Sequence, residues 1–370
     1  MEELRPSALF GEHVAAGATM TPFAGWNMPL RYTSDREEHR AVRESVGKFD
    51  LSHMGQVEVE GPQAAAVLDY SLCTKPSTMP AGRARYSMML APDGGIIDDL
   101  IVYRLEEARY LVVPNGANRI TVVEELTRRG REWCAKNEAS ESHSIVDRTL
   151  ERALIAVQGP ESLEAVVALL GPEDAERVAA LGYYRSLEAK VDGVPAMIAR
   201  TGYTGETGYE IMLPASAAPD VWRKIEAKAC GLASRDTLRL EAGMPLYGNE
   251  LGRDVTPADA GAARLPADHE FVGGGSGRTQ TDVGPLRARR RRPPRRPGGQ
   301  HGDERGARGR KGDLGRAVAD PRISHCARPP RTGNRRRRRS RRRRAGDAAA
   351  HARDVPPVLQ AAQVNPQAAW

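Results

Sequence analysis

Two segments of the chain follow one pattern: Val57-Glu58-Val59-Glu60-Gly61-Pro62 and Leu154-Ile155-Ala156-Val157-Gln158-Gly159-Pro160. Each reads as a strand that ends in Gly-Pro and leads into a helix, which we expect at residues 63–72 in the first case and at 161–170 in the second. The two copies lie about 98 residues apart. This repeat predicts an α+β fold with duplicated βαβ-like (ferredoxin-like) halves, rather than one doubly wound sheet.

The sequence around the two copies predicts further elements. Ser34 followed by Glu37 is a capping box, which favours a helix from there to about Gly47. Asp93-Gly94-Gly95 is a hairpin signal between two strand-like segments. The other elements that we expect are strands at residues 55–60, 85–90, 96–105, 110–113, 196–199 and 208–213, and helices at residues 118–136 and 218–228.

Charge divides the 370-residue chain into an acidic body and a basic tail. Residues 1–260 carry 28 Lys and Arg against 39 Asp and Glu, a net charge of −11, whereas residues 261–370 carry 27 against 9, a net charge of +18. The overall charge of +7 is therefore no sign of a nucleic-acid-binding enzyme. We expect a first α+β half at residues 1–150, a second at 151–261, and the basic tail at 262–370.

Composition excludes several classes of protein. The four cysteines lie far apart, so the sequence predicts neither a disulfide framework nor a zinc knuckle, and we expect no metal. The N-terminus is acidic where a signal peptide is basic, and no segment approaches the roughly eighteen apolar residues of a membrane span. We therefore expect a soluble, cytoplasmic protein without a membrane partner.

The first segment that suggests chemistry is residues 94–102, where Asp98 and Asp99 interrupt an apolar strand. Because alternate residues of a strand face opposite sides, one of the two carboxylates should point toward the core or a cavity in either register. A carboxylate in such a place is paired or functional. The structural alternative is an aspartate that caps the hairpin or binds backbone N–H groups.

The second segment is residues 200–210, which hold three glycines together with Tyr203 and Glu210. The glycines would let the backbone approach a ligand closely, and a plain hairpin loop is the alternative. No Lys-Ser/Thr follows the glycines, so this is not a phosphate-binding loop.

The third segment is residues 234–243, which read as a short helix. Arg235 and Arg239 are four residues apart and would share a face. This spacing suits a ligand that carries a carboxylate, although arginines on an exposed helix face are more often solvated.

These three segments and three others resemble the aminomethyltransferase (T-protein) family of the glycine cleavage system. The other three are Thr21-Pro22-Phe23-Ala24-Gly25-Trp26-Asn27-Met28-Pro29-Leu30, Asp50-Leu51-Ser52-His53-Met54-Gly55 and Met244-Pro245-Leu246-Tyr247-Gly248-Asn249-Glu250-Leu251. The resemblance is collinear from about residue 7 to Gly261, roughly 70% of the chain. Folate-dependent demethylases share the fold, as does a folate-binding iron-sulfur assembly factor, whose Lys-Gly-Cys-x-x-Gly-Gln-Glu motif is absent here.

The resemblance implies a function. It is the transfer of a one-carbon unit from the aminomethylated lipoyl arm of a carrier, the H-protein, to tetrahydrofolate as co-substrate, with release of ammonia. Breaking a sulfur-CH2-NH2 linkage passes through iminium-like character, and the attacking nitrogen must lose a proton. A buried, oriented carboxylate assists both steps.

The resemblance also assigns roles to particular residues. It places the catalytic role on Asp99 and the pterin-binding role on Glu210, whose carboxylate can accept two N–H bonds from the pterin edge. The residues that match further folate contacts are Tyr203, Arg235, Tyr86, Met54 and Asn115. We interpret His53 as structural, because the reaction already has its carboxylate.

Two alternatives stay open at this point. The chain could be a folate-dependent demethylase of a small methylated donor, which the identity of the donor would decide. It could also bind folate or nucleic acid without turnover. The presence of Asp99 and Glu210 argues against a protein that binds folate without turnover. The scarcity of aromatic residues in the tail argues against a nucleic-acid-binding protein.

The tail departs from the family, which continues into a C-terminal β-barrel. Residues 335–344 contain nine arginines, and Phe271 and Trp370 are the only aromatic residues after Ala260. Because such a segment cannot bury a core, we expect residues 262–370 to be disordered, with non-specific binding of nucleic acid through the arginines. Arg, Pro, Gly and Ala have GC-rich codons, so the composition suggests a shifted reading frame and a weakly active or inactive enzyme.

Overall fold

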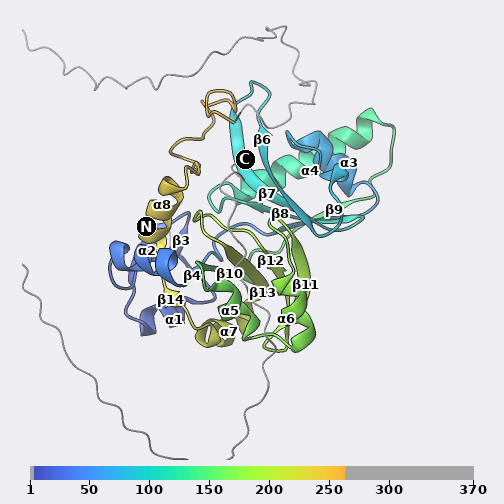
Figure 1. Cartoon of the computed structure of the whole chain (residues 1–370). Coiled ribbons are helices and arrows are strands. Elements are labelled where there is room, and N and C mark those ends of the chain that lie inside the picture. The colour runs from blue at the N-terminus through green and yellow to red at the C-terminus, as the bar shows by residue number, and fades with distance from the viewer. Residues whose placement is uncertain (1–3, 263–370) are drawn as a thin grey trace, which may run out of the picture. The chain divides into compact units, whose positions relative to one another are not determined.

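The computed structural model describes residues 4–262 (Figure 1). The strands are β1 (Arg5–Pro6), β2 (Thr19–Phe23), β3 (Trp26–Arg31), β4 (Gly47–Asp50), β5 (Val57–Glu60), β6 (Arg83–Leu90), β7 (Ile96–Glu106), β8 (Arg109–Pro114), β9 (Ser144–Asp147), β10 (Arg152–Gln158), β11 (Ser186–Val191), β12 (Val194–Ala199), β13 (Gly208–Pro214) and β14 (Lys228–Ala229). The helices are α1 (Phe10–Ala15), α2 (Asp35–Glu44), α3 (Ala64–Ser71), α4 (Arg119–Lys136), α5 (Ser162–Val167), α6 (Pro172–Ala179), α7 (Ala218–Lys224) and α8 (Leu232–Glu241), with short 3-10 turns η1 (Pro76–Thr78) and η2 (Ala215–Ala217). The predictions of a disordered tail, of a missing barrel and of nucleic-acid binding by the arginines fall on residues 263–370 and lie outside the described residues.

Two sheets repeat one strand order. The first sheet has the order β6-β7-β8-β5-β9, and the second has the order β11-β12-β13-β10-β4-β14. In both, the strand of the sequence repeat, β5 or β10, lies beside the last of the three strands that follow its helix. The mixed α+β fold is confirmed. Strand β4, which comes from the first predicted half, lies in the second sheet beside β10.

The halves are not βαβ units of the ferredoxin-like kind, which corrects the prediction. Strand β5 pairs antiparallel with β8, β8 with β7, and β7 with β6, so the two strands that flank α3 run antiparallel. The same chain of antiparallel pairs separates β10 from β11. A βαβ crossover joins parallel strands. The sequence repeat reports the order strand, helix, strand, and contains no information on the direction of the second strand.

Side-chain alternation places the two sheets face to face between two layers of helices. On β10, alternate residues from Ala153 pack against α5 and α7, whereas Leu154 and Ala156 point the other way. On β8, Tyr110 and Val112 pack against α3 and α4, and Figure 1 shows these two helices together beside the first sheet. The side chains between the sheets form what we call the inter-sheet layer, which includes Ala84, Tyr103, Leu111, Val113, Leu154, Ala156, Ala199 and Met212. Both faces of each sheet are therefore buried, as near-continuous apolar runs require.

Several predicted elements match closely, and three helices end early, among them α2, which ends at Glu44 rather than near Gly47. Helix α2 begins at Asp35 because the Ser34 hydroxyl accepts a hydrogen bond from the Glu37 backbone N–H at 3.3 Å, as the capping box predicts. Helices α5 and α7 end at Val167 and Lys224, before residues 170 and 228. After α7 the chain joins the second sheet as β14, beside β4.

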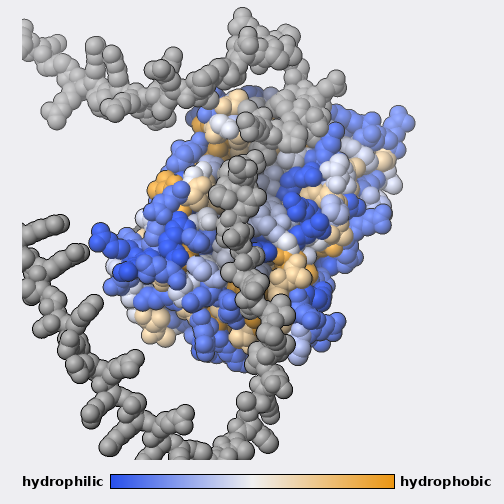
Figure 2. Space-filling view, viewed as in Figure 1, coloured by the Kyte–Doolittle hydropathy of each residue, from blue (hydrophilic) through white to orange (hydrophobic). Residues whose placement is uncertain are grey.

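The surface is mixed. On the face shown in Figure 2, hydrophobic residues occur in small groups among hydrophilic ones. Within residues 4–262, the large hydrophobic side chains that are more than half exposed come from separate elements and loops: Val14, Ile120, Leu150, Tyr183 and Leu240.

Candidate active site

The adjacent carboxylates of β7 face opposite sides of the first sheet. Leu100 and Val102 pack against the helices of that sheet, and Asp98 shares their side of the strand. Asp99 shares its side with Tyr103, which lies in the inter-sheet layer. Asp98 is fully buried and Asp99 is half-buried. The prediction that one of the pair points into the protein is confirmed for Asp98, and Asp99 faces the other half of the molecule.

Asp99 is held by two neutral donors. The Tyr86 hydroxyl donates to Oδ2 at 3.1 Å, and the Asn115 side-chain amide donates to Oδ1 at 2.8 Å and to the Asp99 carbonyl oxygen at 2.9 Å. Burial raises the pKa of Asp99 above its ordinary value, against the lowering effect of these hydrogen bonds and of the Arg235 charge. The carboxylate therefore has more affinity for a proton than a surface aspartate.

Asp98 accepts three hydrogen bonds from one loop. The Asn115 backbone N–H donates to Oδ2 at 3.0 Å, the Asn115 side chain donates to Oδ1 at 3.0 Å, and the Asn118 side chain donates to Oδ1 at 2.6 Å. Asn118 is the residue immediately before helix α4. Burial raises the pKa of Asp98 to about 7, although the Asn118 and Asn115 hydrogen bonds lower it. Asp98 thus matches the structural alternative of binding a backbone N–H, and it binds two side chains as well.

Glu210 lies on β13, opposite Ala156 and Ala199, and faces the inter-sheet layer. Its Oε2 accepts hydrogen bonds from the Thr201 hydroxyl and from the Tyr103 hydroxyl, the latter at 3.3 Å. No donor within residues 4–262 reaches Oε1. Burial raises the pKa of Glu210, while Thr201, Arg235 and Tyr103 lower it. One carboxylate oxygen is thus fixed by the protein and the other is available.

Arg235 is the central cation of the site. Its guanidinium lies over the Tyr203 ring, 4.5 Å from the ring centroid. Its positive charge lowers the pKa of both Asp99 and Glu210. In the part of the chain that the structure describes, no carboxylate forms an ion pair with it. Arg239, four residues further along α8, is buried and paired with Asp236 and Glu250, each at 2.8 Å, so its charge is already neutralised within the protein.

The glycines of residues 200–210 serve packing within the protein. A side chain on Gly202 or Gly208 would lie 2.0 Å or 2.3 Å from the side chain of Gln158, and Gly205 has a φ of +78°. Their expected close approach is therefore to Gln158. Tyr203 in this loop donates its hydroxyl to the Pro245 carbonyl oxygen.

Arg43 of helix α2 ties this loop to helix α8. Its guanidinium donates to the Thr204 carbonyl oxygen at 2.7 Å and to Glu206 at 2.9 Å. The same group donates to Glu241 of α8 at 3.0 Å. The loop that carries Tyr203 and the helix that carries Arg235 are therefore joined by one side chain.

Met54 and His53 come from the segment between β4 and β5. Met54 is half-buried against the inter-sheet layer. His53 is buried, with its ring edge-on to Phe23 at 5.2 Å between centroids. Burial and the Arg235 charge lower the pKa of His53 to about 3, so the ring is neutral at physiological pH. A side chain on Gly116 would lie 2.3 Å from the His53 carbonyl oxygen, so this segment packs directly against the loop that carries Asn115.

The structure thus brings the predicted residues together in two groups linked by the charge of Arg235. Hydrogen bonds join Tyr86, Asp99 and Asn115, and a ring contact joins Tyr203 to Arg235. Sequence reasoning missed the residues that position these groups. They are Tyr103 and Thr201 for Glu210, Asn118 for Asp98, and Arg43 for the loop and helix. Strand alternation could have found Tyr103, which lies four residues after Asp99 on the same face.

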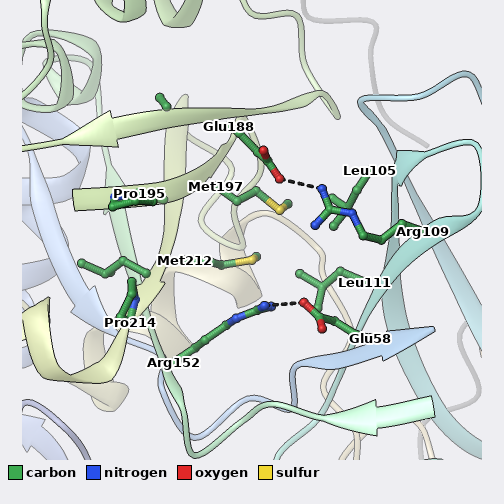
Figure 3. A pocket seen from close by; sticks show the side chains of 13 residues that line it. Glu58, Leu105, Arg109, Leu111, Arg152, Glu188, Pro195, Met197, Met212 and Pro214 are labelled. Atoms are coloured by element: carbon green, nitrogen blue, oxygen red, sulfur yellow. Dashed lines mark hydrogen bonds and ion pairs between the residues drawn. The ribbon is translucent and has the colours of Figure 1, made fainter. Parts of the chain in front are cut away.

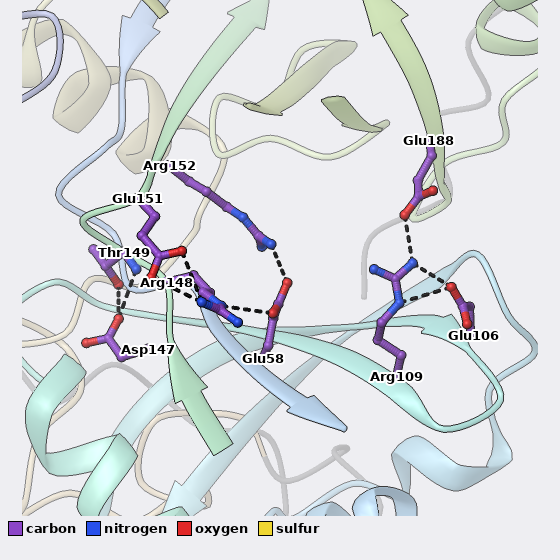
Figure 4. A network of polar contacts seen from close by, with 9 residues as sticks. All are labelled: Glu58, Glu106, Arg109, Asp147, Arg148, Thr149, Glu151, Arg152 and Glu188. Atoms are coloured by element: carbon purple, nitrogen blue, oxygen red, sulfur yellow. Dashed lines mark hydrogen bonds and ion pairs between the residues drawn. The ribbon is translucent and has the colours of Figure 1, made fainter. Parts of the chain in front are cut away.

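A separate cavity of about 280 Å³ lies at the other end of the inter-sheet layer (Figure 3). Met197 and Met212 face Leu105 and Leu111 across it. Leu105 follows Asp99 by six residues on β7, a separation of about 20 Å along a strand. Two groups of ion pairs border the cavity, one formed by Arg109 with Glu106 and Glu188, the other by Glu58 with Arg148 and Arg152 (Figure 4).

Residues 4–262 contain neither a metal-binding cluster nor a membrane-spanning helix. No group of three or more His, Cys, Asp or Glu side chains within residues 4–262 could hold a metal ion. No helix in the same range combines the length and hydrophobicity that a membrane span needs.

Comparison with known proteins places this arrangement in a family. The family described as the GCVT N-terminal domain matches residues 9–266. The aminomethyltransferase of Cutibacterium acnes is 46% identical over 286 residues, covering 74% of this chain and 75% of that protein. The aminomethyltransferase of Streptomyces coelicolor is 49% identical over 281 residues, covering 73% of this chain and 72% of that protein.

A solved structure agrees with these sequence matches. The glycine cleavage system aminomethyltransferase T from Bartonella henselae has a TM-score of 0.64 with this chain and 36% sequence identity, over 71% of this chain and 70% of that one. The resemblance inferred from the six sequence motifs is confirmed. The chain belongs to the aminomethyltransferase family of the glycine cleavage system.

Proposed function

We propose that this chain transfers a methylene unit from the aminomethylated lipoyl arm of the H-protein to tetrahydrofolate, with release of ammonia. The observation that carries the proposal is that one carboxylate from each sheet faces the inter-sheet layer, Asp99 from β7 and Glu210 from β13. Asp99 is oriented by Tyr86 and Asn115, and Glu210 keeps one oxygen without a donor in the described residues. Such a pair can orient a ligand at one end and assist its chemistry at the other.

Asp99 is assigned the catalytic role. Its raised pKa makes it a better proton acceptor than an ordinary aspartate, which suits an attacking amine that must lose a proton. The same negative charge stabilises the positive charge that develops on the transferred carbon. Tyr86 and Asn115 hold the carboxylate in one orientation, so no reorganisation is needed at the moment of reaction.

Glu210, Arg235, Tyr203 and Met54 are assigned to binding tetrahydrofolate. The available Oε1 of Glu210 fits the N–H donors of a pterin edge. Arg235 lies over Tyr203 without a carboxylate partner in residues 4–262, so it can bind an anionic part of the ligand. Tetrahydrofolate would supply the two nitrogens that take up the carbon, and the lipoylated H-protein would supply the carbon.

The test is substitution of Asp99 by Asn, which removes the charge and keeps the shape. We expect ammonia release from the aminomethylated H-protein to fall by at least about 100-fold, the scale of a lost general base, while the dissociation constant for tetrahydrofolate changes by less than about threefold. Asp93→Asn, in the turn of the same hairpin, is the matched control and should retain wild-type turnover.

Wild-type turnover in Asp99→Asn would remove Asp99 from the reaction. Transfer from a small methylated donor without the H-protein, in place of ammonia release from the carrier, would support the demethylase instead.

A further inference from the structure

The side-chain amide of Asn115 stands between the two carboxylates of β7. Its nitrogen donates to Asp98 Oδ1 at 3.0 Å, to Asp99 Oδ1 at 2.8 Å and to the Asp99 carbonyl oxygen at 2.9 Å. An amide nitrogen carries two hydrogens, so three acceptors share two donors. All three acceptors are oxygens, so the amide must direct its nitrogen, not its oxygen, toward them.

Asp98 and Asp99 together set the orientation of this amide. If the Asn115 side-chain amide were rotated by 180°, its oxygen would face the three acceptor oxygens. The contact between these oxygens would be repulsive. Asp98 also accepts the backbone N–H of Asn115 at 3.0 Å, so one carboxylate holds both the main chain and the side chain of this residue. The Asn118 amide, at 2.6 Å, completes the set of donors around Asp98.

We propose that Asp98 is a positioning residue for the transfer reaction, acting through Asn115. Asp98 is buried on the helix-facing side of β7, and its carboxylate helps to hold the Asn115 amide with the nitrogen toward Asp99. That nitrogen holds Oδ1 of Asp99, and Oδ2 is left toward the Tyr86 hydroxyl. This inference rests on the catalytic role proposed above for Asp99.

The competing explanation is that Asp98 only stabilises the loop before helix α4. The Asn118 and backbone contacts alone fit that role, because they tie the loop and the helix start to β7. The contact through the Asn115 side chain is different, since the same nitrogen reaches the catalytic carboxylate. A structural role changes stability, whereas a positioning role also changes the rate of the folded enzyme and its dependence on pH.

The pH dependence follows from the donors around Asp98. Three N–H groups point at this carboxylate, and only its ionised form can accept all of them with both oxygens. Because the pKa of Asp98 is raised to about 7, protonation below that pH weakens one of the three contacts that orient the amide. The charged and titratable groups that face the pair from other elements are Tyr86 on β6, Arg235 on α8, and Tyr203 and Tyr247 in loops. Burial raises the pKa values of these tyrosines, so they stay neutral near pH 7, where Asp98 changes charge.

The experiment compares Asp98→Asn with the wild type in the ammonia-release assay, using the full chain and the aminomethylated H-protein. We expect kcat to fall about 10- to 100-fold with KM for tetrahydrofolate within about twofold, because binding does not use Asn115 alone. In the wild type, kcat should rise with pH through a limb near 7, and in Asp98→Asn this limb should be absent.

Asn118→Ala is the second variant and leaves both carboxylates in place. It removes one hydrogen bond from the ionised form of Asp98, so the limb should move to higher pH and kcat at pH 7 should fall about two- to fivefold. If Asp98→Asn does not fold, this shift decides the question.

The outcomes separate the two proposals. Lower thermal stability of Asp98→Asn, with kcat and the pH limb unchanged, would show that Asp98 is structural only. Retained activity in Asp99→Asn would overturn the catalytic assignment itself, whatever Asp98 does.

Discussion

The carboxylates of Asp50, Asp98, Asp99 and Glu210 differ in their hydrogen-bond donors. Burial alone would raise the pKa of Asp50, but the His13 ring at 2.8 Å lowers it. Asp98, Asp99 and Glu210 are bonded only by neutral donors, so burial prevails and their pKa values are raised. The carboxylate with a histidine partner and the carboxylates of the candidate site thus differ in the direction in which their pKa values are shifted.

The Glu210 oxygen that no donor within residues 4–262 reaches gives a prediction for ligand binding. Substitution of Glu210 by Ala should weaken tetrahydrofolate binding by about 1.5 to 3 kcal/mol, the scale of a hydrogen bond to a charged group, or more than tenfold in dissociation constant. Titration calorimetry measures this directly. Glu188→Ala, an exposed glutamate beside the separate cavity, is the control and should bind as the wild type does. Unchanged affinity in Glu210→Ala would exclude this residue from the pocket.

The helices and strands that local sequence patterns encode could be predicted from the sequence. The helix of residues 35–44 follows from its capping box, and the hairpin of β6 and β7 follows from its glycine turn. The direction of the strands around α3 and the short strands β1 and β14 could not be predicted, because partners distant in sequence set them. The end of α7 at Lys224 is of the same kind, since pairing of β14 with β4 takes over the following residues.

The candidate site shows the same limit. Strand alternation predicted that one aspartate of the pair is buried, but which one depends on the register of β7 against β6 and β8. The hydroxyl of Tyr103 reaches Glu210, a contact across 107 positions of sequence. The partner of Arg43 is 161 positions away at Thr204. No local pattern contains such pairings, so positioning residues are harder to predict than the groups they position.

Arg43 gives a prediction at this scale, because it connects helix α2 to the loop of Tyr203 and to helix α8. Arg43→Ala should weaken tetrahydrofolate binding by about three- to tenfold, corresponding to about 0.6 to 1.4 kcal/mol, as Tyr203 and Arg235 lose their common support. The rate at saturating ligand should change little. Arg40→Ala is the matched control on the same helix, since Arg40 is exposed and pairs only with Glu44. Equal affinities for the two variants would show that the loop and α8 are positioned by other contacts.

The two groups of ion pairs beside the separate cavity join the two sheets (Figure 4). They differ in how far their glutamates are exposed to solvent. Glu58 has a side chain only 9% exposed and accepts from Arg148 and Arg152, whereas Glu188, paired with Arg109, is 68% exposed. Burial would raise the pKa of Glu58, but the two arginines lower it. Solvent screening makes the exposed pair weak.

The two glutamates should therefore differ in what they contribute to stability. Glu58→Gln should lower the free energy of unfolding at pH 7 by about 1.5 to 3 kcal/mol, and Glu188→Gln by at most about 1 kcal/mol. Since the folded-state pKa of Glu58 is depressed, its contribution is present above the ordinary glutamate pKa of about 4.3 and is lost as the pH falls through the folded value. Urea denaturation at pH 7 and near pH 3 measures this. A Glu58→Gln deficit that persists undiminished at pH 3 would contradict it.

Strand β4 has a consequence for the order in which the protein is made. Its residues 47–50 leave the ribosome about 100 residues before β10, the strand they pair with in the second sheet. At ordinary rates of synthesis this interval is roughly 5 to 20 s. During that time the backbone N–H and C=O groups of β4 lack the strand they pair with, and such an unpaired edge is the kind of surface on which aggregation begins. In the nascent chain this edge of β4 therefore stays unpaired until β10, in the second half, has been synthesised.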